Sequence, residues 1–453
     1  MNIKLEKKYG LFTAICMVVG IVIGSGVFFK AGKVLTNNNG NMGMSLLTVG
    51  IVGLIMIICS YVFATLAQRH EKVNGIVDYA EAACGSGYAY TVGWFMTTIY
   101  YPTLTSCLAW ISAQYTAELF NFGATSDLHI VIAAFYLIAG YAVNSLSPKL
   151  AGKFQVSATV IKLVPLILMA IIGTITGLIN GKTAEGLTAV IDGSGMGGSI
   201  FTAIVAFAFA YEGWIIATSI NAELRDSKKN LPLALILGSI IVIVIYLAYF
   251  LGLTGPMTTT ELMNSANIPK EAFSALFGNP VFGTIAYVFV IISCLGTMNG
   301  LMLGCSRGMY SIAVRGQGPV PKVFSQVDDV TNMPTNSSVL GLLLCGLWMV
   351  QWELGLIQGV LPDIIAWENE ELPIITLYAM YIPIFIVMMV RDKDLPKFKR
   401  LVMPVIACLC CAFMVYCAFS AYKIQAVYYL IVFAVIMIIG MFFYRKPKTE
   451  VES

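Results

Sequence analysis

The sequence has few charged residues: Asp, Glu, Lys and Arg together make up 11% of its 453 residues. Soluble globular proteins contain about 25%, so this shortage excludes a soluble enzyme built around one core. The net charge of +3 is also too small to indicate a nucleic-acid partner. The hydrophobic content of 58% instead predicts an all-α protein whose helices cross a lipid bilayer many times.

Metal ligands and catalytic groups are scarce as well. The only two histidines, His70 and His129, lie far apart in sequence, and the 11 cysteines sit mostly inside apolar runs. No spacing typical of a zinc site emerges, and no nucleophile stands near a base. We therefore expect no metal site and no cofactor, and a membrane enzyme is only a distant possibility. The charged amino terminus precedes an apolar run that is too long for a signal peptide, which predicts a retained first span.

Twelve apolar segments have about the length needed to cross a bilayer. They are predicted at residues 10–34, 43–67, 88–119, 128–146, 154–179, 198–222, 231–254, 281–313, 336–353, 371–391, 400–421 and 424–444. Of the 27 Lys and Arg residues, Lys162 lies within a span and 21 lie in loops on one side. The other side has five, namely Lys30, Lys33, Lys182, Lys270 and Lys423. Because cytoplasmic loops are rich in Lys and Arg, we expect a multi-pass protein of the cytoplasmic membrane with both termini in the cytoplasm.

The first span carries Gly24-Ser25-Gly26 at half depth, where glycine weakens a helix. Lipid cannot satisfy the freed backbone groups, so non-helical backbone at this depth must line a cavity within the protein. Its free N–H groups suit a carboxylate. The alternative is that the small residues merely let two helices pack closely.

The sixth span repeats this feature with Ala210-Tyr211-Glu212-Gly213. Five spans separate the two segments, so they cross the bilayer in opposite directions. Paired interruptions in two inverted halves indicate the binding site of a transporter. The second interruption therefore favours the functional interpretation of the first.

Two ionisable side chains lie well inside spans, Lys162 and Glu212. A charge at the bilayer centre costs about 2.5–3.5 kcal/mol on insertion scales, which predicts that both face a cavity. Lys162 could alternatively extend towards the inner interface. Glu212 could contact a substrate ammonium group, carry a proton, or remain neutral and bond to nearby backbone. In span eight, Ser293 and Thr297 share a helix face, where they could line a polar route or bond to their own helix.

Several motifs together resemble the L-amino-acid transporter family of the amino acid–polyamine–organocation superfamily. They lie at residues 20–28, 155–162, 209–214, 223–232, 296–300 and 315–319. The resemblance covers nearly the whole chain. It implies a five-plus-five inverted repeat with broken helices one and six. Residues 1–180 would form the first repeat, residues 181–391 the second, and residues 392–453 two further spans and a cytoplasmic tail.

The resemblance also implies the roles of individual residues. The substrate carboxylate would bind backbone N–H groups around Gly24, Ser25 and Gly26. Carbonyls near Val22, Phe209, Ala210 and Glu212 would receive the amine, and Phe209 would close over the substrate from outside. Lys162, with Ser293 as a neighbour, would take the place that a sodium ion occupies in other transporters.

These observations predict sodium-independent transport of L-amino acids by alternating access, most simply as an exchange of neutral amino acids. Many animal members have Gly at the position of Glu212, which leaves the substrate class open. A proton-coupled symporter of amino acids or cationic amines and an amino-acid-sensing receptor stay open as alternatives. The outer loop at residues 121–127 has no cysteine, so no heavy-chain subunit is expected. The expected partners are the amino acid and the lipid bilayer.

Overall fold

A computed structural model describes residues 10–70, 75–122, 128–189, 199–216, 218 and 224–445. Residues 123–127 of the outer loop lie outside these ranges. So do six of the basic residues counted above, namely Lys4, Lys7, Lys8, Lys72, Lys446 and Lys448. All regular structure in the described part is helical.

The helices of the amino-terminal part are α1 (Leu11–Val22), α2 (Gly26–Phe29), α3 (Ala31–Asn37), α4 (Met42–Arg69), α5 (Ile76–Cys84), α6 (Ser86–Phe95), α7 (Tyr101–Leu119), α8 (Leu128–Leu146), α9 (Pro148–Leu168) and α10 (Thr174–Asn180). Two π-helical turns, η1 (Met96–Tyr100) and η2 (Met169–Gly173), join α6 to α7 and α9 to α10.

The remaining helices are α11 (Lys182–Thr188), α12 (Ile200–Ala208), α13 (Ser227–Leu253), α14 (Thr259–Asn264), α15 (Ile268–Phe277), α16 (Pro280–Ala313), α17 (Pro321–Phe324), α18 (Thr335–Gln351), α19 (Leu372–Arg391), α20 (Met403–Tyr422) and α21 (Ile424–Phe442). Shorter turns of helix are η3 (Phe209–Tyr211), η5 (Trp352–Ile357), η6 (Asp363–Ile365) and η7 (Phe398–Val402).

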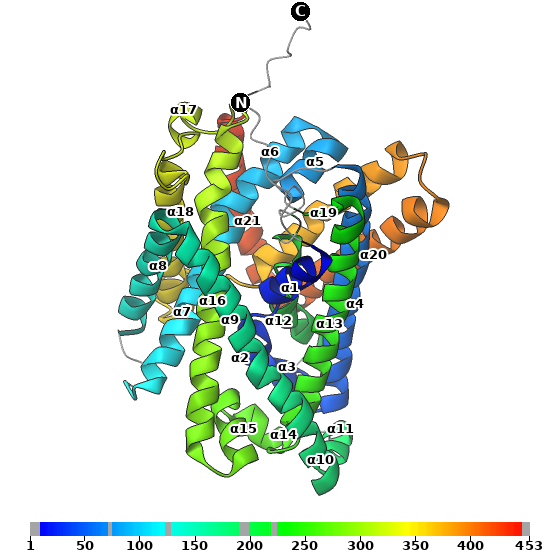
Figure 1. Cartoon of the computed structure of the whole chain (residues 1–453), viewed down its shortest axis with the longest axis vertical. Coiled ribbons are helices and arrows are strands. Elements are labelled where there is room, and N and C mark those ends of the chain that lie inside the picture. Colours follow the sequence, from blue (N-terminus) through cyan, green and yellow to red (C-terminus); the bar gives the residue numbers. More distant parts are fainter. Residues whose placement is uncertain are drawn as a thin grey trace, which may run out of the picture.

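Long helices, among them α4, α13 and α16, run close to the long axis of the molecule (Figure 1). Helix α13 packs against α4, and α16 packs against α7. Short helices lie at the two ends: α5 and α17 at one, and α10, α11, α14 and α15 at the other (Figure 1). Helix α5 lies in the connection between the second and third predicted spans, and α14 and α15 lie in that between the seventh and eighth.

Ten helices in the described part are long and apolar enough to cross a membrane. They match ten of the twelve predicted segments. The predicted third span is a continuous helical run over residues 86–119 but is not among the ten, and the predicted sixth yields only a shorter apolar helix, Ile200–Ile216. The third run is rich in hydroxyl side chains, and several bond to carbonyls of their own helix, as Thr103 does to Ile99 O at 2.7 Å. Such internal bonds satisfy the polar groups of a buried helix even where its hydropathy is low.

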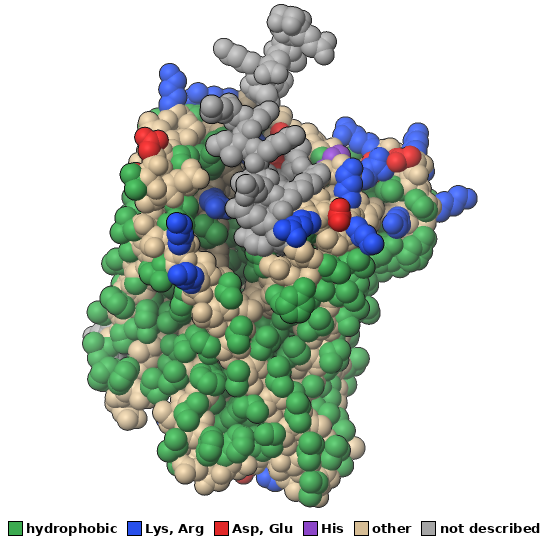
Figure 2. All heavy atoms as spheres, in the orientation of Figure 1, with side chains coloured by type: hydrophobic (Ala, Val, Ile, Leu, Met, Phe, Trp, Pro, Cys, Tyr) green, Lys and Arg blue, Asp and Glu red, His purple; other side chains and the backbone are tan. Residues whose placement is uncertain are grey.

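Side chains are distributed as a bilayer requires. In the orientation of Figure 2, apolar side chains cover the flank, whereas Lys and Arg gather at the end that carries α5 and α17. A flank covered mainly by apolar side chains is suited to contact with lipid. Together with the ten helices that could cross a membrane, it identifies the molecule as a multi-pass membrane protein.

Candidate functional site

Helical backbone stops in the middle of the first span. Helix α1 ends at Val22, Ile23 adopts an extended conformation (φ −68°, ψ 103°), and α2 starts at Gly26. The side chain of Ser25 is buried, and its Oγ makes no hydrogen bond of ordinary geometry, with the Cys294 thiol as a near neighbour. Peptide N–H groups at such a break have no helical partner, so this segment can accept a polar ligand.

A second break lies directly beside the first. Helix α12 ends at Ala208, η3 follows, Glu212 is extended (φ −76°, ψ 159°), and Gly213 has a φ of +102° that favours glycine. A Cβ on Gly213 would lie 2.9 Å from Ile21 Cγ2, and one on Gly26 would lie 2.5 Å from Ala210 Cα. The two interruptions are thus in contact, and glycine is required on both sides of it.

Tyr246 of α13 bridges the two breaks. Its phenol donates to Ala210 O at 2.8 Å and lies 3.3 Å from Val22 O. These are two of the carbonyls that were predicted to receive a substrate amine. Each carbonyl oxygen has a second lone pair, so both retain the capacity to accept another hydrogen bond.

Lys162 is fully buried on α9, and its ammonium donates a hydrogen bond to Gly20 O. This carbonyl belongs to the last turn of α1, where the helix provides no partner. Among the described residues, no carboxylate pairs with Lys162, although the Cys294 thiol of α16 interacts with it electrostatically. The lysine therefore joins α9, α1 and α16. Ser293 is buried too, but its Oγ makes no hydrogen bond in the described part of the chain and so does not bond to Lys162.

The carboxyl group of Glu212 forms a hydrogen bond with a side chain from another span. Its Oε1 accepts a hydrogen bond from the Tyr100 phenol of η1, while Oε2 is buried without a hydrogen bond of ordinary geometry. The phenols of Tyr378 and Tyr381 on α19 lie within electrostatic range. The hydrogen bond between Tyr100 and Glu212 was not predicted from the sequence.

The sequence also missed a buried ionic cluster, which we call the Lys30 cluster. It consists of Lys30, Lys33, Glu368, Glu370, Glu371 and Tyr422. The distribution of basic residues placed Lys30 on the outer side, where a charged side chain normally meets water, yet only 1% of its surface is exposed. One signal was available: two of the five basic residues on the outer side are Lys30 and Lys33, and three glutamates crowd into residues 368–371.

Phe209 connects this cluster to the two breaks. Its ring, on η3, is nearly buried, and Lys30 Nζ lies 5.9 Å from the ring centroid. A cation over an aromatic face is attracted by the ring quadrupole. The aromatic residue that was predicted to close over the substrate is therefore in contact with a buried charge of the cluster.

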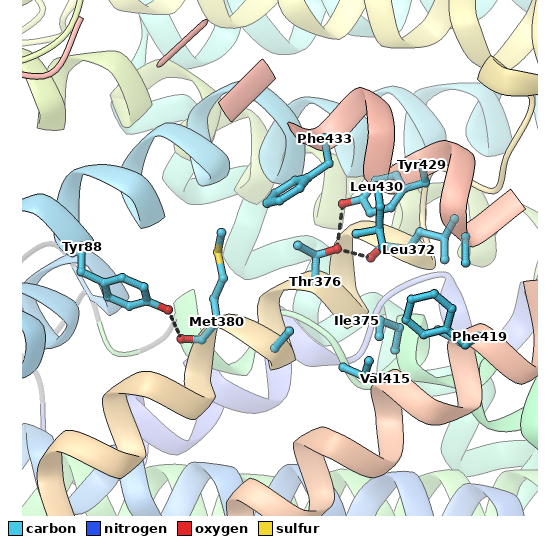
Figure 3. Close-up of a pocket in the computed structure, with 13 residues that line it drawn as sticks. Tyr88, Leu372, Ile375, Thr376, Met380, Val415, Phe419, Tyr429, Leu430 and Phe433 are labelled. Carbon is cyan, nitrogen blue, oxygen red and sulfur yellow. Dashed lines mark hydrogen bonds between the residues drawn. The ribbon is translucent and has the colours of Figure 1, made fainter. Parts of the chain in front are cut away.

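A separate cavity of about 280 Å³ lies between α19, α20 and α21 (Figure 3). Its polar groups are already paired: Tyr88 donates to Met380 O at 2.7 Å, and the Thr376 hydroxyl donates to Leu372 O and bonds to the Tyr429 hydroxyl. Hydrocarbon side chains form the rest of the wall. A free amino acid has two charges that this wall could not satisfy, so the cavity is not a substrate site.

The profile of the amino acid permease family matches residues 9–443. The chain belongs to this family. The permease is 27% identical over 397 residues to the serine/threonine exchanger SteT of Bacillus subtilis (strain 168), covering 87% of this chain and 86% of SteT. It is 31% identical over 333 residues to the human b(0,+)-type amino acid transporter 1, covering 71% of this chain and 66% of that protein.

Among solved structures, that of MhsT in complex with L-phenylalanine covers 91% of the permease and all of its own chain, with a TM-score of 0.64 at 14% identity. At this identity the likeness concerns the fold alone. Since the family and these relatives are transporters, the expectations of an amino acid transporter and of a protein without enzymatic function are confirmed.

Proposed function

We propose that this permease exchanges neutral L-amino acids across the cytoplasmic membrane without sodium. The observation that carries the proposal is the contact between the two interrupted segments at Gly26 and Ala210. This contact brings together backbone N–H and carbonyl groups that have no partner within a helix. An amino acid zwitterion carries a carboxylate and an ammonium group that match these donors and acceptors.

The carboxylate would bind the peptide N–H groups of Gly24, Ser25 and Gly26, together with the Ser25 hydroxyl. The amine would take the free lone pairs of the Val22 and Ala210 carbonyls, near the carbonyls of Phe209 and Glu212. This pose is supported by the burial of Ser25 without an ordinary hydrogen bond and by the position of Phe209 beside the second break.

Lys162 supports the absence of a sodium requirement. Its ammonium already bonds to the carbonyl end of α1, so a fixed cation satisfies a group that would otherwise attract a soluble one. Ser293 would line the adjoining part of α16. The name of the relative SteT, a serine/threonine exchanger, favours exchange of neutral amino acids over uptake of cationic amines.

Alternating access would move the segments that hold the two breaks relative to the surrounding helices. We propose twelve spans in two inverted repeats, residues 1–180 and 181–391, followed by two spans in residues 392–453. The basic end with α5 and α17 would face the cytoplasm with both termini, and no heavy-chain subunit would be needed. Substrate must bind the two conformations differently for such coupling to work.

A proton-coupled symporter is the second candidate, because Glu212 and Lys162 are two buried titratable groups that form no ion pair in the described part of the chain. An amino-acid-sensing receptor would bind substrate without moving it.

Uptake by purified permease in proteoliposomes separates the three functions. A panel of labelled amino acids, including L-serine, is offered with and without internal amino acid, sodium or a pH gradient. Exchange predicts uptake that needs internal substrate and ignores sodium. Uptake that follows an inward proton gradient into empty vesicles would establish the symporter instead, and binding without accumulation would establish the receptor.

A further inference from the structure

The Lys30 cluster is an unusual concentration of charge for a buried place. Lys30 Nζ bonds to Glu370 at 2.6 Å and to Glu371 at 2.7 Å, and Lys33 Nζ bonds to Glu371 at 2.8 Å and to Glu368 at 2.9 Å. The side chains of Glu370 and Glu371 are fully buried. Burial of this many charges costs several kcal/mol per ion unless each is paired, so the pairing decides whether the arrangement persists.

The cluster links three parts of the molecule. The lysines lie at the start of α3 and within it, the glutamates lie just before α19, and Tyr422 at the end of α20 donates a hydrogen bond to Glu371. The short α2 lies directly between the first break and Lys30. Any movement that separates α2 and α3 from α19 must therefore break the ion pairs.

The charges of the cluster do not balance. Three carboxyl groups face two ammonium groups, and the Glu368 and Glu370 carboxyls have oxygen atoms within 4.8 Å of each other. Glu370 Oε1 accepts from Lys30, but the buried Oε2 receives no hydrogen bond in the described part of the chain. Two adjoining carboxylates cannot both stay ionised cheaply, and one proton between them removes the repulsion. One proton also makes the cluster neutral.

We propose that the Lys30 cluster is a lock that closes the outer end of the substrate site, and that it closes by taking up one proton, held on Glu370. The proposal rests on the proposed function, because it assigns α2 and α3 to the outer gate. The three carboxylates offer oxygen atoms within 4.8 Å of one another, a spacing that a metal ion could use. Two ammonium groups already bond to these carboxylates, which favours the proton over a metal.

The surroundings of Glu370 agree with a protonated group. Burial, with the charges of Glu368 and Glu371, raises the pKa of Glu370 to about 8 despite the opposing effect of Lys30. Although burial raises the pKa of Glu368, the ammonium groups of Lys30 and Lys33 bring it down to about 2. The other titratable neighbours are Tyr422 on α20 and Cys107 on α7. Once the lock opens and water enters, the pKa of Glu370 returns towards its ordinary value of 4.5.

The direction of the pH effect follows from these values. Between about pH 5 and pH 8 the closed lock binds one proton that the open, hydrated lock has released. Closure is therefore favoured at low pH. As the pH increases, the equilibrium constant for opening rises by up to about tenfold per pH unit in this range and then levels off. Glu368 is ionised in both states over the same range and adds no dependence of its own.

Cys107 provides a native reporter of opening, because its buried thiol lies beside Lys30 and Glu370. Permease in lipid nanodiscs, without substrate, is treated with maleimide between pH 5.5 and 8.5, and modification is quantified for each cysteine by mass spectrometry. Cys84 corrects for the intrinsic reactivity of thiols with pH: it is half-buried at the end of α5, next to Ala83, whose carbonyl accepts from Arg391 at the end of α19 far from the cluster. We expect the ratio of Cys107 to Cys84 modification to rise by up to about tenfold per pH unit and then to level off near pH 8.

Glu370→Gln provides the matched variant, because a neutral amide replaces the protonated carboxyl. We expect its Cys107 to stay protected, with a ratio to Cys84 that does not change with pH. A flat ratio in the wild-type permease would overturn the proposal, as would a Glu370→Gln protein that retains the wild-type pH dependence. The wild-type series needs no variant, so poor folding of Glu370→Gln would leave the test intact. Because no substrate is present, failure of the lock is distinguishable from failure of the exchange function.

Discussion

The two breaks and the Lys30 cluster lie close together, yet they treat buried polar groups in opposite ways. At the breaks, Ser25 Oγ, Ser293 Oγ and Glu212 Oε2 are buried without ordinary hydrogen bonds. In the cluster, each ammonium group bonds to two carboxylates. Buried polar groups normally have partners. The comparison shows that the protein pairs the charges of the cluster within itself, apart from Glu370 Oε2, whereas among the described residues it leaves these side-chain oxygens at the breaks without ordinary partners.

The largest effect is expected from removal of one charge of the cluster. Lys30→Met leaves Glu370 and Glu371 buried without their shared cation, and breaking a buried ion pair costs about 3–5 kcal/mol. We expect a clear drop in the midpoint of thermal denaturation in detergent. Lys33→Met is the matched control: the Lys33 side chain is 28% exposed, so its loss should cost much less. Equal drops for both variants would contradict a distinction based on burial.

The contact between the two breaks is tested by Gly26→Ala. The new Cβ would lie 2.5 Å from Ala210 Cα, in backbone that cannot give way without movement of α2. We expect about 1–3 kcal/mol of destabilisation together with a loss of exchange. Gly50→Ala on α4 is the control, since a Cβ there meets nothing within 4 Å, and it should be neutral or slightly stabilising. Normal exchange by Gly26→Ala would show that the close approach is not required.

Substitution of Lys162 should reduce transport but not stability, whereas substitution of Lys30 should reduce stability. Lys162→Met removes a buried cation that has no carboxylate partner among the described residues, so the thermal midpoint should not fall. We nevertheless expect exchange to slow by at least about tenfold, equivalent to about 1.4 kcal/mol, because α1 loses the donor to Gly20 O. Normal exchange of L-serine by Lys162→Met in proteoliposomes would refute the role proposed for this lysine.

The smallest effect is expected at Tyr100. Tyr100→Phe removes the donor to Glu212 Oε1, and a single hydrogen bond contributes about 1 kcal/mol. We therefore expect the apparent KM for exchange to rise by about fivefold. Tyr101→Phe, which alters the adjoining ring, should leave KM unchanged. A Tyr100→Phe protein with wild-type KM would place Glu212 outside the machinery of transport.

Local patterns in the sequence were sufficient to predict several elements of the site. Glycine at mid-span indicated where the helices stop, near Gly24 and Gly213, and the insertion cost of charge singled out Lys162 and Glu212. The all-helical, multi-pass architecture followed from composition in the same way. The roles that were assigned to Val22, Ser25 and Phe209 in substrate binding stay predictions.

Contacts between distant segments could not be predicted. Tyr100 and Glu212 are 112 residues apart, and Lys30 and Glu370 are 340 apart. No periodicity within one helix specifies which residue of another helix it will meet. The pairing of Glu368, Glu370 and Glu371 with Lys30 and Lys33 could not be predicted for the same reason, because the two groups are encoded far apart.

The π-helical turn η1 ends at Tyr100, whose phenol meets Glu212. Such a turn is an α-helix that has gained one residue. Deletion of a single residue within Met96–Tyr100 would restore the regular helix and rotate the preceding helix α6 by about 100° relative to α7. One in-frame deletion could thus replace the side chain that faces Glu212 while leaving α7 in place. The π-helical turn therefore sets which side chain of this span meets Glu212.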